Sequence, residues 1–303
     1  MTFDAKDILL FALSLFTAWY LYRLAAAFRA NRADPIAGAS VDPNAATITT
    51  GFVTNFFDTL GIGSFATTTA IFRQWKMVRD ELVPGTLNVG HTIGAILQAF
   101  FFTKLVPVDA RTLILMIGAA VAGAWLGAGV VSSWPRRRIQ IGMGACLLGA
   151  ATLMLLGVLN LVPAGGELLA LTGPKLVIAI AVNMTLGALM TLGIGLYAPC
   201  LILVSMLGMN PVAAFPIMMG SCAFLMPVAS DRFMRARRYD PGASLGLLIG
   251  SIPAVVIVVY IVKSLPLVAV RWLVIVVVVY AAVGLLRAAM KGSPAAAEGM
   301  PAA

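Results

Sequence analysis

The sequence predicts an all-α polytopic membrane protein, and its composition, its long uncharged segments and its basic loops support that prediction. Of the 303 residues, 61% are hydrophobic and 11% are charged, whereas a soluble domain carries about 25% charged residues. So few polar groups cannot cover the surface of a globular protein in water. The outer surface is therefore expected to face a lipid bilayer, which is the first predicted partner of the chain.

Apolar segments of membrane-spanning length follow one another along the chain. A helix needs about 20 residues to cross a bilayer. The first segment, 8–28, lacks the basic region and small-residue cleavage site of a signal peptide, so we expect it to be retained. The stretch 176–230 holds 55 residues without a charge, enough for two or more segments. The other predicted segments are 48–72, 82–103, 112–134, 139–161, 241–262 and 267–286.

An internal repeat divides these segments into two halves. Residues 59–63 (TLGIG) recur as residues 191–195, at an offset of 132. One proline accompanies the motif in each half, because Pro84 matches Pro216 at the same offset. Duplicated halves of this kind are common in transporters. The predicted organisation is an N-terminal transmembrane helix at 1–30, a first repeat at 44–165, a second repeat at 174–290 and a disordered tail at 291–303.

The basic loops predict that the two repeats are inverted. Arginine and lysine cluster at 23–32, 73–79, 136–138 and 232–238. Basic loops favour the cytoplasmic side, and these four could not share one side if every apolar segment crossed the membrane. They share it if both glycine-containing segments enter and return. Each repeat is then a re-entrant helical hairpin with a Gly-x-Gly break followed by three transmembrane helices. Because three is odd, the repeats are inverted, and the C-terminus is cytoplasmic.

The two glycine breaks predict an anion site near the membrane midplane. Glycine allows the backbone to leave the helix, and the helix that begins after each break presents N–H groups and a partial positive charge. Neighbouring hydroxyl and amide groups add donors. The predicted substrate-binding residues are Gly61, Gly63, Ser64, Thr67, Thr68, Asn88, Gly193, Gly195 and Tyr197. The alternative is a structural role in which the glycines allow close helix packing.

Asp58 and His91 are ionisable residues within apolar segments of the first repeat. Such residues often mark ion paths or proton relays, but Asp58 could equally cap N–H groups at the helix break. His91 is the only histidine, so it cannot build a multi-histidine metal site, and it is either a hydrogen-bonded packing residue or a proton carrier. The three cysteines lack metal-ligand spacing, and the basic residues form no continuous stripe. We therefore expect the chain to bind no metal, no other cofactor and no nucleic acid.

Residues 58–66 (DTLGIGSFA), followed by residues 83–91 (VPGTLNVGH), resemble the sulfite exporter TauE/SafE family. Residues 193–195 and residues 209–212 (MNPV) are similar to the second half of its duplicated pattern. The resemblance covers about residues 48–290 and leaves the N-terminal helix as an addition. Many members carry three consecutive glycines where this chain has GIGS at 61–64. The resemblance implies a bacterial plasma-membrane protein that exports sulfite, sulfoacetate or a related organosulfonate.

The residues and the resemblance together predict a transporter of a small sulfur oxyanion or organosulfonate, and not an enzyme. An inside-negative potential favours anion exit by about 2.3 kcal/mol per charge per 100 mV, so export requires no obligatory coupling ion. The sequence contains no GxxxxGK[ST] nucleotide-binding motif and no Ser/His/Asp set or carboxylate pair for catalysis. An anion channel and a non-transporting membrane sensor or assembly subunit are the alternatives, and the oligomeric state is left open.

Overall fold

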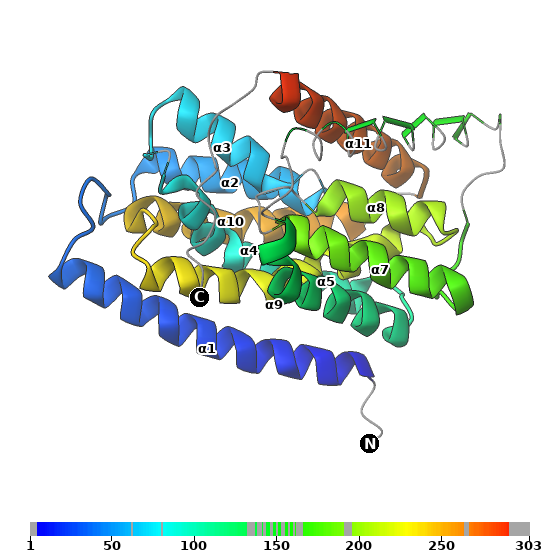
Figure 1. Ribbon diagram of the computed structural model, residues 1–303, viewed down its shortest axis with the longest axis horizontal. Coiled ribbons are helices and arrows are strands. Elements are labelled where there is room, and N and C mark those ends of the chain that lie inside the picture. Colours follow the sequence, from blue (N-terminus) through cyan, green and yellow to red (C-terminus); the bar gives the residue numbers. More distant parts are fainter. Residues whose placement is uncertain are drawn as a thin grey trace. The chain divides into compact units, whose positions relative to one another are not determined.

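The computed structural model is built from helices (Figure 1). It describes residues 5–61, 63–79, 81–131, 137, 141, 144–145, 148–149, 151–152, 155–156, 158–159, 161, 166–190, 196–263 and 267–290. Within these residues the extended structure is limited to one isolated bridge between Leu168 and Met209. The helices are α1 (Ala5–Ala33), α2 (Ala45–Thr59), α3 (Ser64–Gln74), α4 (Val83–Leu105), α5 (Ala110–Val131), α7 (Gly173–Met190), α8 (Tyr197–Met206), the short 3-10 helix η1 (Pro211–Ala213), α9 (Ala214–Arg235), α10 (Pro241–Lys263) and α11 (Leu267–Met290). The predicted all-α class is confirmed for this part of the chain.

The helices follow the predicted apolar segments closely. Helices α4, α10 and α11 begin within one residue of the expected positions. Helix α1 is longer than predicted at both ends, and its C-terminal extension carries one buried residue, Asn31. Most of the expected segment 139–161 and the whole tail 291–303 lie outside the described residues. Within the described residues, four helical stretches are long and apolar enough to cross a membrane, which is consistent with an all-α membrane protein: Ala5–Ala33, Gly173–Met190, Pro211–Arg235 and Pro241–Ile261.

The chain forms two compact units, each of which combines segments from both predicted repeats. Unit 1 contains Met1–Thr59, Gly63–Phe101 and Cys222–Tyr260. Unit 2 contains Leu60–Ile62, Phe102–Ser221 and Ile261–Ala303. These units describe how the folded chain is packed, whereas the repeats describe how the sequence is duplicated. The predicted repeat boundaries therefore stay a prediction.

In unit 1, α2 and α3 lie side by side and form a helical hairpin, called the first hairpin below (Figure 1). The break between them lies where the glycine motif predicts it, since α2 ends at Thr59 and α3 begins at Ser64. Gly61 has a φ of +98° and Gly63 a φ of +85°. Residues with a Cβ rarely adopt these angles. The two glycines thus provide the backbone conformation that separates the helices.

Both outer ends of the first hairpin lie at the same end of unit 1. Arg79, after α3, donates a hydrogen bond of 3.0 Å to the carbonyl of Ala37, which lies before α2. The connection between α1 and α2 also reaches the start of α10, because the Ser40 N–H donates to the Asp240 carboxylate at 2.8 Å. The Asp240 N–H in turn donates to Thr86 of α4 at 2.8 Å. An apolar cluster lies near this end: Phe72, Val78, Leu82, Val83, Leu87, Ala243 and Leu247.

Helix α1 contacts the rest of unit 1 through hydrogen bonds and ion pairs in its C-terminal half. The hydroxyl of Tyr20, which is fully buried, donates to the carbonyl of Val89 on α4 at 3.0 Å. Nearer the end of α1, the Arg23 guanidinium contacts the Asp231 carboxylate of α9 at 2.6 Å. The same carboxylate contacts Arg235 at 2.8 Å. These contacts make α1 an integral part of unit 1.

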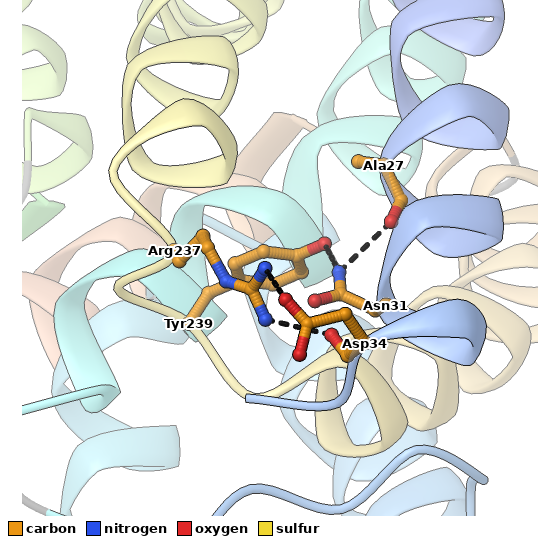
Figure 2. Close-up of polar contacts among 5 residues, drawn as sticks. All are labelled: Ala27, Asn31, Asp34, Arg237 and Tyr239. Carbon is orange, nitrogen blue, oxygen red and sulfur yellow. Dashed lines mark hydrogen bonds and ion pairs between the residues drawn. The ribbon is translucent and has the colours of Figure 1, made fainter. Parts of the chain in front are cut away.

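The C-terminal end of α1 meets the loop between α9 and α10 (Figure 2). The Asn31 amide donates to the Tyr239 hydroxyl and to the carbonyl of Ala27. The Arg237 guanidinium donates to the carboxylate and to the carbonyl of Asp34, both at 2.6 Å. Burial raises the pKa of Tyr239 to about 12, so its hydroxyl is neutral near pH 7 and keeps its role in this contact.

In unit 2, α7 and α8 are also in contact (Figure 1), and they are called the second hairpin below. Its outer ends are joined by two backbone hydrogen bonds. The Leu168 N–H, before α7, donates to the carbonyl of Gly208 at 3.3 Å, and the Asn210 N–H, after α8, donates to the carbonyl of Leu168 at 2.9 Å. In each hairpin, the start of the first helix and the end of the second helix therefore lie at the same end of the unit.

Glycines allow α5 and α7 to approach closely within unit 2. A Cβ added to Gly123 of α5 would collide with the carbonyl oxygen of Met184, and a Cβ added to Gly187 of α7 would collide with that of Ala120. Asn183 lies in the same helix pair, where its amide donates to the carbonyl of Met116 at 2.7 Å. This buried amide therefore joins two helices.

Candidate functional site

Buried polar side chains gather around the break of the first hairpin, all in unit 1. They come from α2, α3 and α4, and each is at most 5% exposed. Polar groups in an apolar membrane protein are costly unless paired, and they often mark a functional site. This set, called the polar cluster below, consists of Asn55, Asp58, Thr59, Ser64, Thr68, His91 and Gln98.

Asp58 bridges the two sides of the break. One carboxylate oxygen accepts the backbone N–H of Ser64, the first residue of α3, at 2.6 Å. The other accepts the side-chain amide of Gln98 on α4 at 2.8 Å. The same Gln98 nitrogen donates to the hydroxyl of Thr59 at 2.9 Å. Asp58 thus has the geometry of a helix cap supplied from the preceding helix, because Gly63 at the N-cap position has no side chain to do so.

This geometry affects the predicted anion site in the first hairpin. The N–H of Ser64 is bonded to an internal carboxylate, so it is not available to a substrate in this conformation. A negative side chain at a helix N-terminus is stabilising by itself, because it offsets the partial positive charge there. Of the two roles considered for Asp58, helix cap and proton relay, its hydrogen bond to the Ser64 N–H is that of a helix cap. A role in proton coupling stays a hypothesis.

His91 lies between the two helices of the first hairpin and uses both ring nitrogens. Nδ1 is 2.9 Å from the amide nitrogen of Asn55 on α2, and Nε2 is 3.0 Å from the hydroxyl of Thr68 on α3. The imidazole also packs against Phe65, with the two ring centroids 6.0 Å apart. His91 therefore connects α2 to α3 from a position on α4.

The other predicted residues of the first repeat lie near the cluster but do not join its hydrogen bonds. The Thr67 hydroxyl donates within α3, to the carbonyl of Ser64 at 2.9 Å. The Asn88 amide donates within α4, to the carbonyl of Pro84 at 2.9 Å. Ser64 and Thr68 are the predicted hydroxyl residues that do belong to the polar cluster, Ser64 through Asp58 and Thr68 through His91.

The predicted residues of the second break are only partly described. Gly193 and Gly195 lie outside the described residues. Tyr197 begins α8 and is 6% exposed. Leu196, at the N-cap of α8, makes no side-chain capping bond, and the residue that matches Asp58 at the repeat offset is Met190. The prediction that both breaks line one cavity stays a prediction.

Three members of the polar cluster, Asn55, Thr59 and Gln98, were not among the predicted site residues. A signal for them exists in the sequence, because helix positions three, four or seven apart share a face. Asn55 precedes Asp58 by three positions, and Gln98 follows His91 by seven. Polar residues repeated at helical spacing within apolar segments could have identified them.

No protein-family model, curated protein or solved structure matches the chain. The likeness to the sulfite exporter family therefore rests on the motif residues alone. Among the described residues, no three histidine, cysteine, aspartate or glutamate side chains lie together in a way that could hold a metal ion.

Gly63→Ala tests the conformation of the break. A Cβ at Gly63 would have no neighbour within 4 Å, so its effect would come from the positive φ of +85°. We expect a loss of about 1 kcal/mol in stability, measured by thermal unfolding in detergent. Gly118→Ala is the control, since position 118 also has open space but lies inside α5 without a positive φ. Equal effects of the two changes would contradict a conformational role for Gly63.

Proposed function

We propose that this chain is a membrane transporter that exports a small sulfur oxyanion or organosulfonate, such as sulfite or sulfoacetate, across the bacterial plasma membrane. The observation that carries the proposal is the polar cluster at a glycine break in an otherwise apolar chain. Broken helices in transporters place unpaired backbone groups at the substrate site. The motif resemblance names the class of substrate.

The dimensions of the first hairpin support a re-entrant segment. Helices α2 and α3 contain 15 and 11 residues. At 1.5 Å per residue they are roughly 22 and 16 Å long, shorter than the ~30 Å hydrocarbon core. The contact between Arg79 and Ala37 brings the outer ends of the hairpin together. A segment that enters the membrane, turns at the glycines and returns to its starting side accounts for both observations.

A second re-entrant hairpin is proposed for α7 and α8. Helix α7 is by itself long enough to cross, but α8 has 10 residues, too few to cross, and the Leu168 hydrogen bonds bring the outer ends of the two helices together. With three transmembrane helices in each repeat, the repeats would be inverted, and the basic loops and the C-terminus would be cytoplasmic. Arg79 and Arg237 both contact the connection between α1 and α2, at Ala37 and Asp34. These contacts support placing the loop of Arg79 and the loop of Arg237 on the same side of the membrane.

Each break, taken by itself, is proposed to offer N–H and O–H donors to an anion. In the first hairpin, Thr68 is the best placed hydroxyl, because the N–H and the side chain of Ser64 are both bonded to Asp58 and the Thr67 hydroxyl is bonded within its own helix. The start of α8 offers N–H groups at the second break. The membrane potential would supply the driving force for exit.

Flux through the purified protein in proteoliposomes tests the proposal. We expect sulfite or sulfoacetate to leave loaded vesicles faster in the presence of the protein, and faster still with an inside-negative potential. Vesicles with a Gly61→Ala, Gly63→Ala double variant are the matched control. Absence of flux for sulfite, sulfoacetate and sulfate alike would reject the proposed function. Potential-dependent flux that does not saturate with anion concentration would favour a channel.

A further inference from the structure

Hydrogen-bond donors and acceptors in the polar cluster can be assigned from the side-chain amide of Asn55. Its nitrogen lies 2.7 Å from the carbonyl oxygen of Gly51 and 2.9 Å from Nδ1 of His91. Rotating the amide by half a turn would place its oxygen against the Gly51 carbonyl, so that two acceptors would face each other. The nitrogen therefore donates one proton to Gly51 and the other to His91.

This assignment fixes the tautomer of His91. Because Nδ1 accepts a proton from Asn55, it carries no proton of its own. A neutral imidazole then has its single proton on Nε2. The Nε2–H group faces the hydroxyl oxygen of Thr68 at 3.0 Å and donates to it. The hydrogen bonds therefore run in one direction: Asn55 of α2 donates to His91, and His91 donates to Thr68 of α3.

Because the Thr68 hydroxyl accepts from His91, its own proton remains to be donated to a different acceptor. Seven other threonines of α2, α3 and α4 donate to the carbonyl four residues earlier: Thr50, Thr54, Thr59, Thr67, Thr69, Thr86 and Thr92. Within the described residues, Thr68 makes no such backbone bond and has His91 as its hydrogen-bond partner. It is also fully buried. A buried donor without an acceptor is unfavourable, and a bound anion would remove this penalty.

We propose that His91 is a positioning residue that makes the Thr68 hydroxyl a donor for the transported anion. This inference rests on the proposed function and assigns His91 a role different from that of a proton carrier. Because Nε2–H donates to Thr68, the Thr68 hydroxyl cannot donate to the imidazole. Its proton is therefore available to an acceptor other than Asn55 and His91. An oxyanion oxygen is such an acceptor.

The tautomer is measured directly on the wild-type protein. His91 is the only histidine, so protein labelled with ¹⁵N-histidine and reconstituted in lipid gives one set of imidazole signals. We expect a protonated Nε2 and an unprotonated Nδ1. A proton on Nδ1 would overturn the proposal, whatever the protein transports.

Saturation kinetics test the role of the donor. In sulfite efflux from proteoliposomes, Thr68→Val is expected to raise KM about 10- to 100-fold, the effect of losing a hydrogen bond to a charged group. Thr68→Ser, which keeps the hydroxyl, should stay near the wild type. Thr69→Val is the matched control, because the Thr69 hydroxyl donates within its own helix to Phe65 at 2.7 Å, and its KM should not change.

A double-mutant cycle links His91 to Thr68. His91→Leu frees the Thr68 hydroxyl to turn toward its own helix, so it should raise KM by itself but add nothing in the Thr68→Val background. Independent effects of the two changes, or a fall in maximal rate with unchanged KM, would show that His91 only packs. Lack of efflux by the wild type rejects the proposed function, whereas normal efflux with an unchanged KM in Thr68→Val rejects the positioning role.

Discussion

Asp58→Ala is expected to destabilise the first hairpin by about 3 kcal/mol and to abolish transport. The change removes both carboxylate oxygens at the break, so the N–H of Ser64 loses its acceptor, and the amide of Gln98, which keeps its bond to Thr59, loses one of its acceptors. Each buried donor without an acceptor costs about 1–3 kcal/mol. Thermal unfolding of the detergent-solubilised protein measures the loss of stability, and proteoliposome flux measures the loss of transport.

Asp58→Asn separates the loss of the cap from the loss of charge. The asparagine carbonyl can still accept the Ser64 N–H, so the decrease in stability should be only about 1 kcal/mol. Its NH₂ group would face the amide of Gln98, and adding Gln98→Glu should recover part of the decrease by restoring a carboxylate–amide pair. If Asp58→Asn were as unstable as Asp58→Ala, the carboxylate would not act as a cap.

The same variant distinguishes capping from proton coupling. Both oxygens of Asp58 have protein donors, and export down the membrane potential requires no proton. We therefore expect equal wild-type flux with and without an imposed pH gradient at constant potential. Wild-type flux that follows the gradient, together with Asp58→Asn flux that does not, would instead identify Asp58 as the carrier of a coupling proton.

Local features of the fold could be predicted from the sequence because they depend on local physical chemistry. Long apolar segments predict helices at almost the observed positions, as α4 and α10 illustrate. The break at Gly61 and Gly63 was predicted because glycine adopts positive φ values that interrupt a helix. The capping alternative for Asp58 could also be stated, since acidic residues commonly cap helix N-termini.

Long-range partners could not be predicted in the same way. Gln98 contacts Asp58 from 40 positions away, and the sequence does not specify how α4 rotates to place it there. Helix α1 gives a second example. It was predicted as an N-terminal addition, but its pairing of Arg23 with Asp231 spans 208 positions. Such contacts depend on which helix faces pack together, and one sequence with weakly amphipathic helices leaves that open.

The close packing of α5 and α7 predicts a large effect of one methyl group. Gly123→Ala would place a Cβ on the carbonyl oxygen of Met184, and a backbone atom inside a helix cannot move aside as a flexible side chain does. We expect a loss of about 3 kcal/mol, at the upper end for overpacking, because the two helices must separate. Close approach at small residues contributes much of the packing energy between transmembrane helices. Thermal unfolding in detergent measures the loss.

Gly118→Ala, in the same helix, is the matched control for this effect. A Cβ at Gly118 would have no neighbour within 4 Å, and alanine favours the helix over glycine by up to about 1 kcal/mol, so this variant should be as stable as the wild type or slightly more stable. Gly187→Ala, which approaches the same interface from α7, should repeat the loss seen with Gly123→Ala. If Gly123→Ala and Gly118→Ala unfold at the same temperature, the close approach of α5 and α7 does not exist in the membrane protein, and the placement of Asn183 against Met116 fails with it.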